Sequence, residues 1–232
     1  MSIKGFQGTS LLDYPARIAS LVFYSGCNMR CAYCHNAALV ETPEVYPDIC
    51  ADDLFDLVAA RRGFIDAVVI SGGEPTLDGA MPQLVERLKS LDLRIKLDTN
   101  GLRPQVVEAL LQKNLLDFVS LDLKTAPERY LELGAPADAA AALRTSVSIL
   151  CAANIDIEFR TTCMPGYVET EDIHAVGALI GHAGPWVLQQ FVPEYAQDER
   201  ARAVVPHSRA VMQGFLAIAS QYADTVTLRG MA

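Results

Sequence analysis

The residues most able to do chemistry are three cysteines, Cys27, Cys31 and Cys34, which lie in the pattern C-x3-C-x2-C. This spacing brings three thiolates together from one tight loop and leaves a fourth position around a metal centre open. Cysteine thiolates hold iron–sulfur clusters, and a cubane cluster with three protein ligands keeps one iron free for further chemistry. The pattern therefore predicts a reactive iron–sulfur centre rather than one that only carries electrons.

Other cysteine sites share parts of this pattern. A structural zinc site needs four protein ligands, and although His35 or Cys50 could be the fourth, no second C-x2-C or H-x3-5-H pair follows. The run from Cys31 to His35 matches C-x-x-C-H haem attachment, but it leaves Cys27 unexplained, and the opening MSIKGFQGTS does not resemble a secretory leader. Disulfide frameworks belong to short secreted chains with a higher cysteine density. We expect the remaining cysteines to be small core residues: Cys50, Cys151 and Cys163.

Length and charge narrow the class of protein. The chain has 232 residues and a net charge of −9, which is unlike the basic footprint of a nucleic-acid binder. No apolar stretch approaches 18 residues, so we expect no transmembrane helix. No low-complexity linker divides the chain, and we predict one domain over residues 1–232. We expect a soluble, cytoplasmic protein, because thiols stay reduced in the cytoplasm and can hold a cluster.

Short apolar runs typical of strands alternate with segments of helical spacing. The predicted strands are Ile18–Tyr24, Ala67–Ile70, Leu93–Leu97, Phe118–Leu121, Ile155–Thr161 and Trp186–Gln190, with a further short strand at Thr225–Arg229. The predicted helices are Asp52–Arg62, one that begins at Pro104, one that begins at Thr170, and Pro206–Tyr222. This alternation predicts an α/β fold with parallel strands and right-handed crossovers. We expect the first sixteen residues to form an N-terminal extension, either a small hairpin or a lid.

Alternation within the strands predicts which side chains share a face. Lys96 and Asp98 fall on one face of their strand, Ser120, Asp122 and Lys124 on one face of the next, and Glu158, Arg160 and Thr162 on one face of another. Helices must pack on the opposite, apolar faces, so the charged faces look into a common interior. We therefore predict a partial (β/α)6 barrel, open rather than closed, whose lumen holds a polar ligand. The alternative is an open sheet with one face in water.

Function in βα folds gathers in the loops that follow the strands. After the cysteine loop come Ser71-Gly72-Gly73-Glu74-Pro75, then Asp98-Thr99-Asn100-Gly101, and then Asp122-Leu123-Lys124. Two adjacent glycines let backbone groups approach a ligand closely, although the same run is typical of a tight turn. Glu74 could accept hydrogen bonds from a ligand ammonium. Asp98 and Asp122 could serve acid–base chemistry, bind a cation, or form ion pairs with lysine and arginine.

These motifs resemble those of the radical S-adenosylmethionine superfamily. The cysteine run with Tyr33 before its third cysteine is similar to the family's cluster motif, and the Gly72-Gly73-Glu74 run is similar to its methionine-binding motif. The resemblance implies a partial (β/α)6 barrel and a [4Fe–4S] cluster that binds S-adenosylmethionine at its open iron. One electron then cleaves the sulfonium to methionine and a 5′-deoxyadenosyl radical, which abstracts a hydrogen atom.

Within that superfamily, the run from Gly5 to Pro15 and the residues around the cysteines resemble the branch that activates glycyl radical enzymes. The likeness is greatest to activating proteins of anaerobic ribonucleoside-triphosphate reductase. This resemblance implies that a glycine α-hydrogen on a partner protein is abstracted, and that a flavodoxin- or ferredoxin-type protein donates the electron. It implies neither a nucleic-acid nor a membrane partner.

The resemblance also assigns roles to the residues that match the family motifs. Cys27, Cys31 and Cys34 would ligate the cluster; Tyr33 and His35 would lie along the adenosine; Gly72, Gly73 and Glu74 would hold the methionine amine; Lys124 would contact the cofactor. Asp98, Thr99 and Asp122 resemble positions that bind a monovalent cation near the cofactor carboxylate. Where pyruvate formate-lyase activators have a histidine after a proline, this chain has Pro193-Glu194-Tyr195, so Tyr195 is the candidate adenosine partner.

Two alternative functions follow from the same residues. The radical chemistry could act on a small molecule, such as a pterin- or deazapurine-type base, and detection of a glycyl radical on a partner would separate that from the leading hypothesis. A non-enzymatic iron–sulfur or zinc protein would instead cleave no S-adenosylmethionine.

Overall fold

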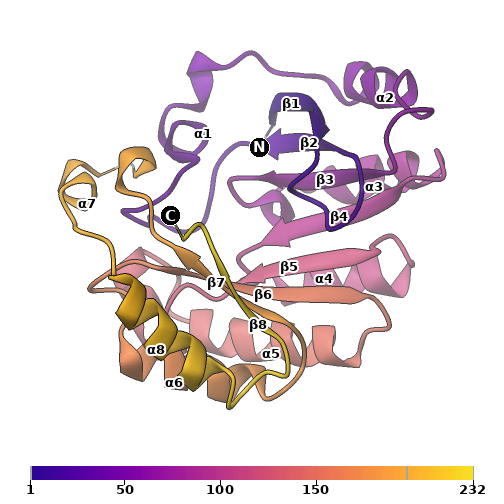
Figure 1. Cartoon of the computed structure of the whole chain (residues 1–232). Coiled ribbons are helices and arrows are strands. Elements are labelled where there is room, and N and C mark those ends of the chain that lie inside the picture. The colour runs from indigo at the N-terminus through magenta and orange to yellow at the C-terminus, as the bar shows by residue number, and fades with distance from the viewer. Residues whose placement is uncertain (1, 197, 232) are drawn as a thin grey trace.

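The structure is a computed structural model that describes residues 2–196 and 198–231. Its eight strands form one sheet in sequential order, and each strand is parallel to its neighbours except the first, which is antiparallel to the second. The strands are β1 (Ile3–Ser10), β2 (Ala19–Tyr24), β3 (Ala67–Gly72), β4 (Arg94–Thr99), β5 (Phe118–Asp122), β6 (Asp156–Cys163), β7 (Trp186–Gln190) and β8 (Val226–Arg229). Figure 1 shows this sheet curving into an open barrel with helices on its outer side.

Helices follow the strands and cover the outside of the sheet. The α-helices are α1 (Ala37–Glu41), α2 (Ala51–Ala59), α3 (Met81–Lys89), α4 (Pro104–Gln112), α5 (Ala139–Ala152), α6 (Thr170–Ile180), α7 (Glu199–Arg202) and α8 (Arg209–Ala219). Four short 3-10 helices are η1 (Pro43–Val45), η2 (Pro75–Leu77), η3 (Pro127–Leu133) and η4 (Pro193–Tyr195).

Local sequence signals set several of these helix starts. Pro104 occupies the first turn of α4, where its missing N–H costs nothing. Glu169 and Asp172 form a reciprocal capping box at the start of α6. The hydroxyl of Ser208 accepts a hydrogen bond from the backbone of Val211, and so begins α8 three residues later than the predicted Pro206.

The α/β prediction is confirmed, and the six predicted strands are the central six of the eight. The predicted short strand near the C-terminus is β8, and half of the N-terminal extension is β1, which pairs with β2 as one arm of a hairpin. Four helices were not identified from sequence: the short α1 and α7, and the longer α3 and alanine-rich α5. The prediction that all three isolated cysteines lie in the core is wrong for two of them. Cys50 is exposed and caps α2, Cys151 is exposed on α5, and only Cys163 is buried.

Two apolar clusters lie on opposite faces of the sheet. The larger one joins the outer faces of the strands to the helices, for example Ile95 and Leu97 of β4 with Val107 and Leu110 of α4. The smaller one lies inside the barrel and contains Tyr14, Ala19, Leu21, Ala67, Val69 and Phe118, with Phe23 packed against it. The inner faces of β2 and β3 are therefore largely apolar, whereas the charged side chains predicted for the interior lie on β4, β5 and β6.

Strand register brings the predicted charged residues together on that inner face. Asp122 lies opposite Arg160 across the β5–β6 pair, and Asp98 lies opposite Ser120 across the β4–β5 pair. Because parallel strands pair without offset here, the side chains of β4, β5 and β6 meet at the same level in the lumen. We call the lumen-facing residues Lys96, Asp98, Asp122, Glu158 and Arg160 the charged wall, and the interior apolar cluster the apolar wall.

Candidate functional site

One cavity of about 530 Å³ contains nearly all the predicted site residues. It extends from the cysteine loop after β2 into the lumen, where residues of both walls line it. The predicted residues that line it are Cys27, Cys31, Tyr33, Cys34, His35, Gly72, Gly73, Glu74, Asp98, Thr99, Asp122 and Lys124. Tyr195 is the predicted residue that does not line this cavity. The loops after β2, β3, β4 and β5 thus converge on one space, as βα folds arrange their active sites.

The cysteine loop is fixed by backbone contacts rather than by its thiols. The Cys34 N–H donates to the Cys31 carbonyl at 3.0 Å, and the Arg30 N–H donates to the Leu133 carbonyl of η3 at 2.7 Å. The Arg30 guanidinium also donates to the Cys27 carbonyl at 2.8 Å. These bonds hold the loop in shape and leave its sulfur atoms facing the cavity.

Burial raises the pKa of all three thiols. The pKa of Cys31 rises to about 11, and those of Cys27 and Cys34 are raised as well, in each case chiefly because burial disfavours the thiolate. The thiols are therefore protonated at neutral pH in the free protein. Metal ligation requires the thiolate, so it must release these protons.

Gly72 and Gly73 bring the loop after β3 against the cysteine loop. A Cβ on Gly73 would lie 1.9 Å from the Gly26 carbonyl oxygen, and one on Gly72, whose φ is +116°, would lie 2.4 Å from backbone atoms of Tyr24. The Glu74 N–H donates to the Gly26 carbonyl at 2.8 Å. The two glycines therefore let the loop after β3 pack closely against the protein's own backbone at Tyr24 and Gly26.

The Glu74 carboxylate ties the ends of β3 and β4 together. It accepts hydrogen bonds from the Thr76 backbone at 3.1 Å, the Thr99 hydroxyl at 2.8 Å and the Asn100 backbone at 2.7 Å. Burial raises the pKa of this carboxyl, while these hydrogen bonds act to lower it. Both of its oxygens are already bonded, so the carboxylate positions the two loops that border the cavity.

Asp98 and Asp122 lie in a continuous ion network along the charged wall. Asp98 pairs with Lys96 on its own strand and with Arg160, whose Nη1 lies 3.5 Å from it. Asp122 accepts from Arg160 Nε at 2.8 Å and from Lys124 Nζ at 3.3 Å. Burial alone would raise the pKa of Asp122, but Arg160 and Lys124 outweigh it and hold that pKa below its ordinary value.

The aromatic residues near the cysteines lie at different depths. Tyr33 is buried, contacts the rings of Tyr167 and Phe191, and donates its hydroxyl to the Lys124 carbonyl at 3.5 Å. His35 is exposed at the edge of the cavity, and burial and Lys124 together lower the pKa of its imidazole. Tyr195 lies outside the cavity, and its exposed ring meets that of His35 edge-on with centroids 5.7 Å apart.

Three asparagines, Asn28, Asn36 and Asn100, border the site and were not assigned a role from sequence. The Asn100 side chain donates to Asn28 at 2.8 Å and lies 3.7 Å from the Cys27 sulfur. The Asn36 side chain donates to the Gly72 carbonyl at 2.7 Å, and so links the cysteine loop to the glycine loop. All three adjoin residues of the predicted motifs: Asn28 follows Cys27, Asn36 follows His35, and Asn100 follows Thr99 at the end of β4. This adjacency was the available signal.

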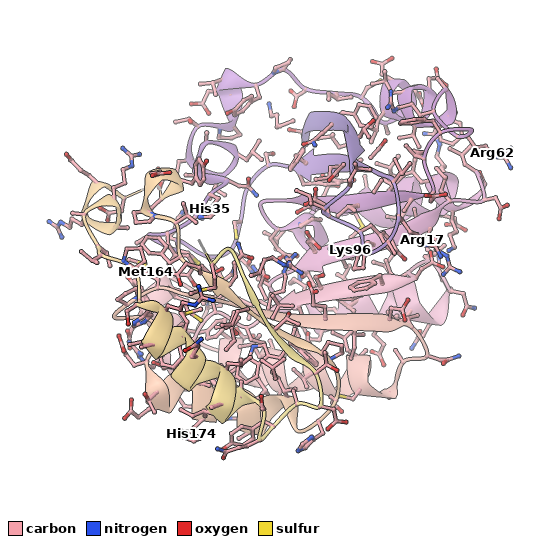
Figure 2. All side chains as sticks on the ribbon, in the orientation of Figure 1. Arg17, His35, Arg62, Lys96, Met164 and His174 are labelled. Atoms are coloured by element: carbon pink, nitrogen blue, oxygen red, sulfur yellow. The ribbon has the colours of Figure 1, made fainter. Side chains whose placement is uncertain are left out.

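The remaining histidines lie away from this cavity. His174 is exposed on α6 and contacts Tyr222. Figure 2 shows His174 and Arg62 at the periphery of the molecule, whereas Lys96 lies among the strands of the sheet.

Within residues 2–196 and 198–231, no three histidine, cysteine or acidic side chains converge tightly enough to hold a single metal ion. In the same part of the chain, no helix is long and apolar enough to cross a membrane.

Comparison with known proteins identifies relatives along the whole chain. It is 31% identical over 232 residues to a Methanocaldococcus jannaschii protein named "Putative glycyl-radical enzyme activating enzyme", covering 98% of this chain and 95% of the relative. It is 25% identical to the pyruvate formate-lyase 1-activating enzyme of Escherichia coli, covering 97% of each. The greater likeness to reductase activators stays a prediction.

Solved structures share the fold at low sequence identity. Streptococcus suis SuiB matches with a TM-score of 0.66 and 16% identity, over 90% of this chain and 49% of SuiB, so the chain spans about half the length of that protein. A domain of pyruvate-formate lyase-activating enzyme from Bacteroides vulgatus matches with a TM-score of 0.55 and 16% identity, over 71% of this chain and 99% of that domain.

Family membership follows from a match that covers most of the barrel. Residues 21–177, from β2 into α6, match the Radical SAM superfamily. This family uses a [4Fe–4S] cluster and S-adenosylmethionine, and the three cysteines and the glycine loop of the cavity fall within the matched residues. The chain belongs to the radical S-adenosylmethionine superfamily and is an enzyme of that kind.

Proposed function

We propose that this protein activates a glycyl radical enzyme by abstracting the α-hydrogen of one glycine in that partner. The observation that carries the proposal is the single cavity, in which the cysteine loop, the glycine loop and the charged wall all meet. Two relatives that match nearly the whole chain bear names of activating enzymes of this type. Within this class we propose anaerobic ribonucleoside-triphosphate reductase as the partner, on the resemblance of the N-terminal and cysteine-loop residues.

We propose that Cys27, Cys31 and Cys34 hold the cluster. The donor set supports this, because three thiols from one loop face one cavity and no fourth cysteine lines it among the described residues. A cubane is larger than a single ion, and its cysteines bind separate iron atoms. Three spread thiols are therefore compatible with a cluster, although they do not converge on one point.

The glycine loop and the residues beyond it are proposed to hold S-adenosylmethionine. Gly72, Gly73 and Glu74 would take the methionine amine, with Glu74 acting mainly by fixing the loop, since its oxygens are already bonded. Tyr33 and His35 would lie along the adenosine, and Lys124 would contact the cofactor from the loop after β5. Tyr195 could join them through its ring contact with His35.

Held by these residues, the cluster and S-adenosylmethionine would supply one-electron reductive cleavage of the sulfonium and the abstraction of a hydrogen atom. The chain's own residues orient the reactants and exclude water. Leu21, Phe23 and Leu12 line the same cavity as the cysteines, so one side of the reaction space is apolar. Arg160, Gln189 and Arg229 line the other side and can donate hydrogen bonds to peptide carbonyls.

The electron is proposed to come from a flavodoxin- or ferredoxin-type protein. We also propose that the whole chain acts as one domain, which the single eight-stranded sheet supports.

The test uses anaerobic protein reconstituted with iron and sulfide, then mixed with S-adenosylmethionine, dithionite and anaerobic ribonucleoside-triphosphate reductase whose glycines carry α-deuterium. The proposal predicts a glycyl radical by electron paramagnetic resonance and deuterium in the 5′-deoxyadenosine. Cys27→Ala should give neither, and Cys151→Ala, which changes an exposed cysteine on α5, should behave like the wild type.

Two outcomes would overturn parts of the proposal. Formation of 5′-deoxyadenosine without deuterium and without a glycyl radical would exclude this partner and favour a small-molecule substrate. An absence of 5′-deoxyadenosine, with the cluster present and S-adenosylmethionine bound, would contradict the proposed chemistry itself.

A further inference from the structure

The charged wall contains its own cations at the place where the family resemblance implies a bound one. We infer that the Lys96 ammonium and the Arg160 guanidinium take the place of a monovalent cation beside Asp98 and Asp122, so that cofactor binding in this protein needs no such ion. The inference rests on the proposed function, since it assumes that this cavity binds S-adenosylmethionine. Asp98, Thr99 and Asp122, as they lie here, do not fit a cation site.

Lys96 is a buried charge without a role in the proposed chemistry. It is 2% exposed on the inner face of β4, where its ammonium pairs with Asp98 and lies 5.5 Å from the centre of the Phe118 ring. A buried lysine is costly unless it is paired, and here both the carboxylate and the ring face compensate it. Lys96 therefore acts as a fixed cation under Asp98.

The carboxylate oxygens of the two aspartates are already engaged by donors. One oxygen of Asp98 binds Lys96, and the other accepts from the Ser71 hydroxyl at 3.1 Å and faces Arg160 at 3.5 Å. One oxygen of Asp122 accepts from Arg160 at 2.8 Å and the other from Lys124 at 3.3 Å. A bound cation needs several free oxygen ligands, and each of these four oxygens already faces a cationic donor, so an added cation would have to compete with an ion pair at every one of them.

The charge balance points the same way. Three carboxylates, Asp98, Asp122 and Glu158, face four cations, Lys96, Lys124, Arg160 and Arg229, so this connected cluster has a net charge of +1. A further cation would be repelled, whereas an anionic group is attracted. Lys124 and Arg160 both line the cavity, and the carboxylate of S-adenosylmethionine is the anion that the proposed function supplies. Lys96 is then a positioning residue, because it acts through Asp98.

The test measures S-adenosylmethionine binding by calorimetry on anaerobic, cluster-reconstituted protein. Wild type, Lys96→Met and Lys96→Ala are compared in potassium, sodium, ammonium and tetramethylammonium chloride at equal ionic strength. We expect the wild-type Kd to change less than about twofold among the four salts, because binding needs no coordinated ion. Tetramethylammonium is too large to occupy a coordination site, so its salt is the ion-free reference. Both variants should bind about tenfold more weakly in tetramethylammonium chloride, because a charge-assisted hydrogen bond to Asp98 is lost.

Rescue separates an electrostatic role from a merely structural one. In Lys96→Ala, which vacates the space of the side chain, ammonium or potassium should restore most of the affinity, and in Lys96→Met, which fills that space, they should not. A wild-type Kd that depends on potassium or sodium would overturn the inference, as would a Lys96→Ala variant whose affinity is the same in all four salts. If the wild type bound no S-adenosylmethionine in any salt, the proposed function would fail instead.

Discussion

The two walls of the lumen are built on the same kind of strand but are held by different forces. Along β2 and β3 the inward side chains are Ala19, Leu21, Ala67 and Val69, which pack with Tyr14 and Phe118 as a core does. Along β4 to β6 the inward side chains are charged and are held by ion pairs. The apolar wall is therefore expected to contribute stability, and the charged wall to contribute binding chemistry.

An open barrel can enclose a reactive site when only one of its walls is filled with apolar side chains. A closed eight-stranded barrel fills its interior with apolar layers. Here the apolar filling is restricted to one wall, and the cavity lies between it and the charged wall, with the cysteine loop at one end. Substitutions on the two walls should therefore separate stability from cofactor binding.

The largest effect is expected from removing the guanidinium that joins the two aspartates. Arg160→Met leaves Asp98 and Asp122 partly uncompensated, so we expect about 3 kcal/mol lower stability and at least about tenfold weaker S-adenosylmethionine binding. Urea unfolding and calorimetry measure the two. Arg160→Lys keeps the charge without the planar fork and should be intermediate. Unchanged binding in Arg160→Met would show that the charged wall does not contribute to the S-adenosylmethionine site.

A substitution on the apolar wall should lower stability alone. Val69 is fully buried on β3 and does not line the cavity among the described residues. Val69→Ala should cost about 2 kcal/mol in urea unfolding, from lost burial and a small cavity, with the Kd for S-adenosylmethionine unchanged. If binding weakened as much as in Arg160→Met, the separation between the walls would be wrong.

A smaller and pH-dependent effect is expected at Asp122. Its pKa in the folded protein is lower than the ordinary 3.8, so its ionised form stabilises the fold above that pH, and the stabilisation is lost as pH falls through the folded value. Because the carboxylate is partly exposed, we expect the free energy of unfolding of the wild type to be only about 1 kcal/mol higher than that of Asp122→Asn at pH 7. Chemical denaturation from pH 7 to pH 2.5 should show that difference shrinking below pH 4. A constant difference would contradict the assignment.

The smallest effect concerns the hydroxyl of Tyr14 in the apolar wall. This group is buried and has no hydrogen-bond partner among residues 2–196 and 198–231, and burial raises its pKa. Tyr14→Phe removes an unsatisfied polar atom and keeps the ring contact with Phe118, so stability should rise by up to about 1 kcal/mol. Thermal unfolding of the two proteins checks this, and a loss of stability would mean that the hydroxyl is in fact bonded.

The charged wall could be predicted from sequence, and the apolar wall could not. Along β4 and β6, polar residues such as Lys96, Asp98 and Arg160 alternate with apolar ones, and this period of two identifies the inner face. In Ala67-Val68-Val69-Ile70 both faces are apolar, and alternation gives no signal. The contacts of the apolar wall with Tyr14 also depend on how the loop after β1 folds back, which is a long-range feature.

Within the site, the motifs predicted which loops meet but not how they are joined. Two hydrogen bonds join the loops, one from Asn36 to Gly72 and one from Asn100 to Glu74. They depend on how the loops pack in three dimensions, which the spacing of the motifs does not reveal. From sequence, Asp98 and Asp122 could either form ion pairs or bind a cation. Their ion pairing depends on the strand register, which places Arg160 opposite Asp122.

The most direct test of the central claim, that the cysteine end of this cavity performs radical chemistry, is cofactor cleavage by the reconstituted protein. Wild type, Cys27→Ala and Cys151→Ala are reduced anaerobically with dithionite and given S-adenosylmethionine, and 5′-deoxyadenosine and methionine are quantified by chromatography. We expect equal amounts of both products from the wild type and Cys151→Ala, and none above background from Cys27→Ala. Product from Cys27→Ala at the wild-type level, or none from a wild type with its cluster in place, would contradict this claim.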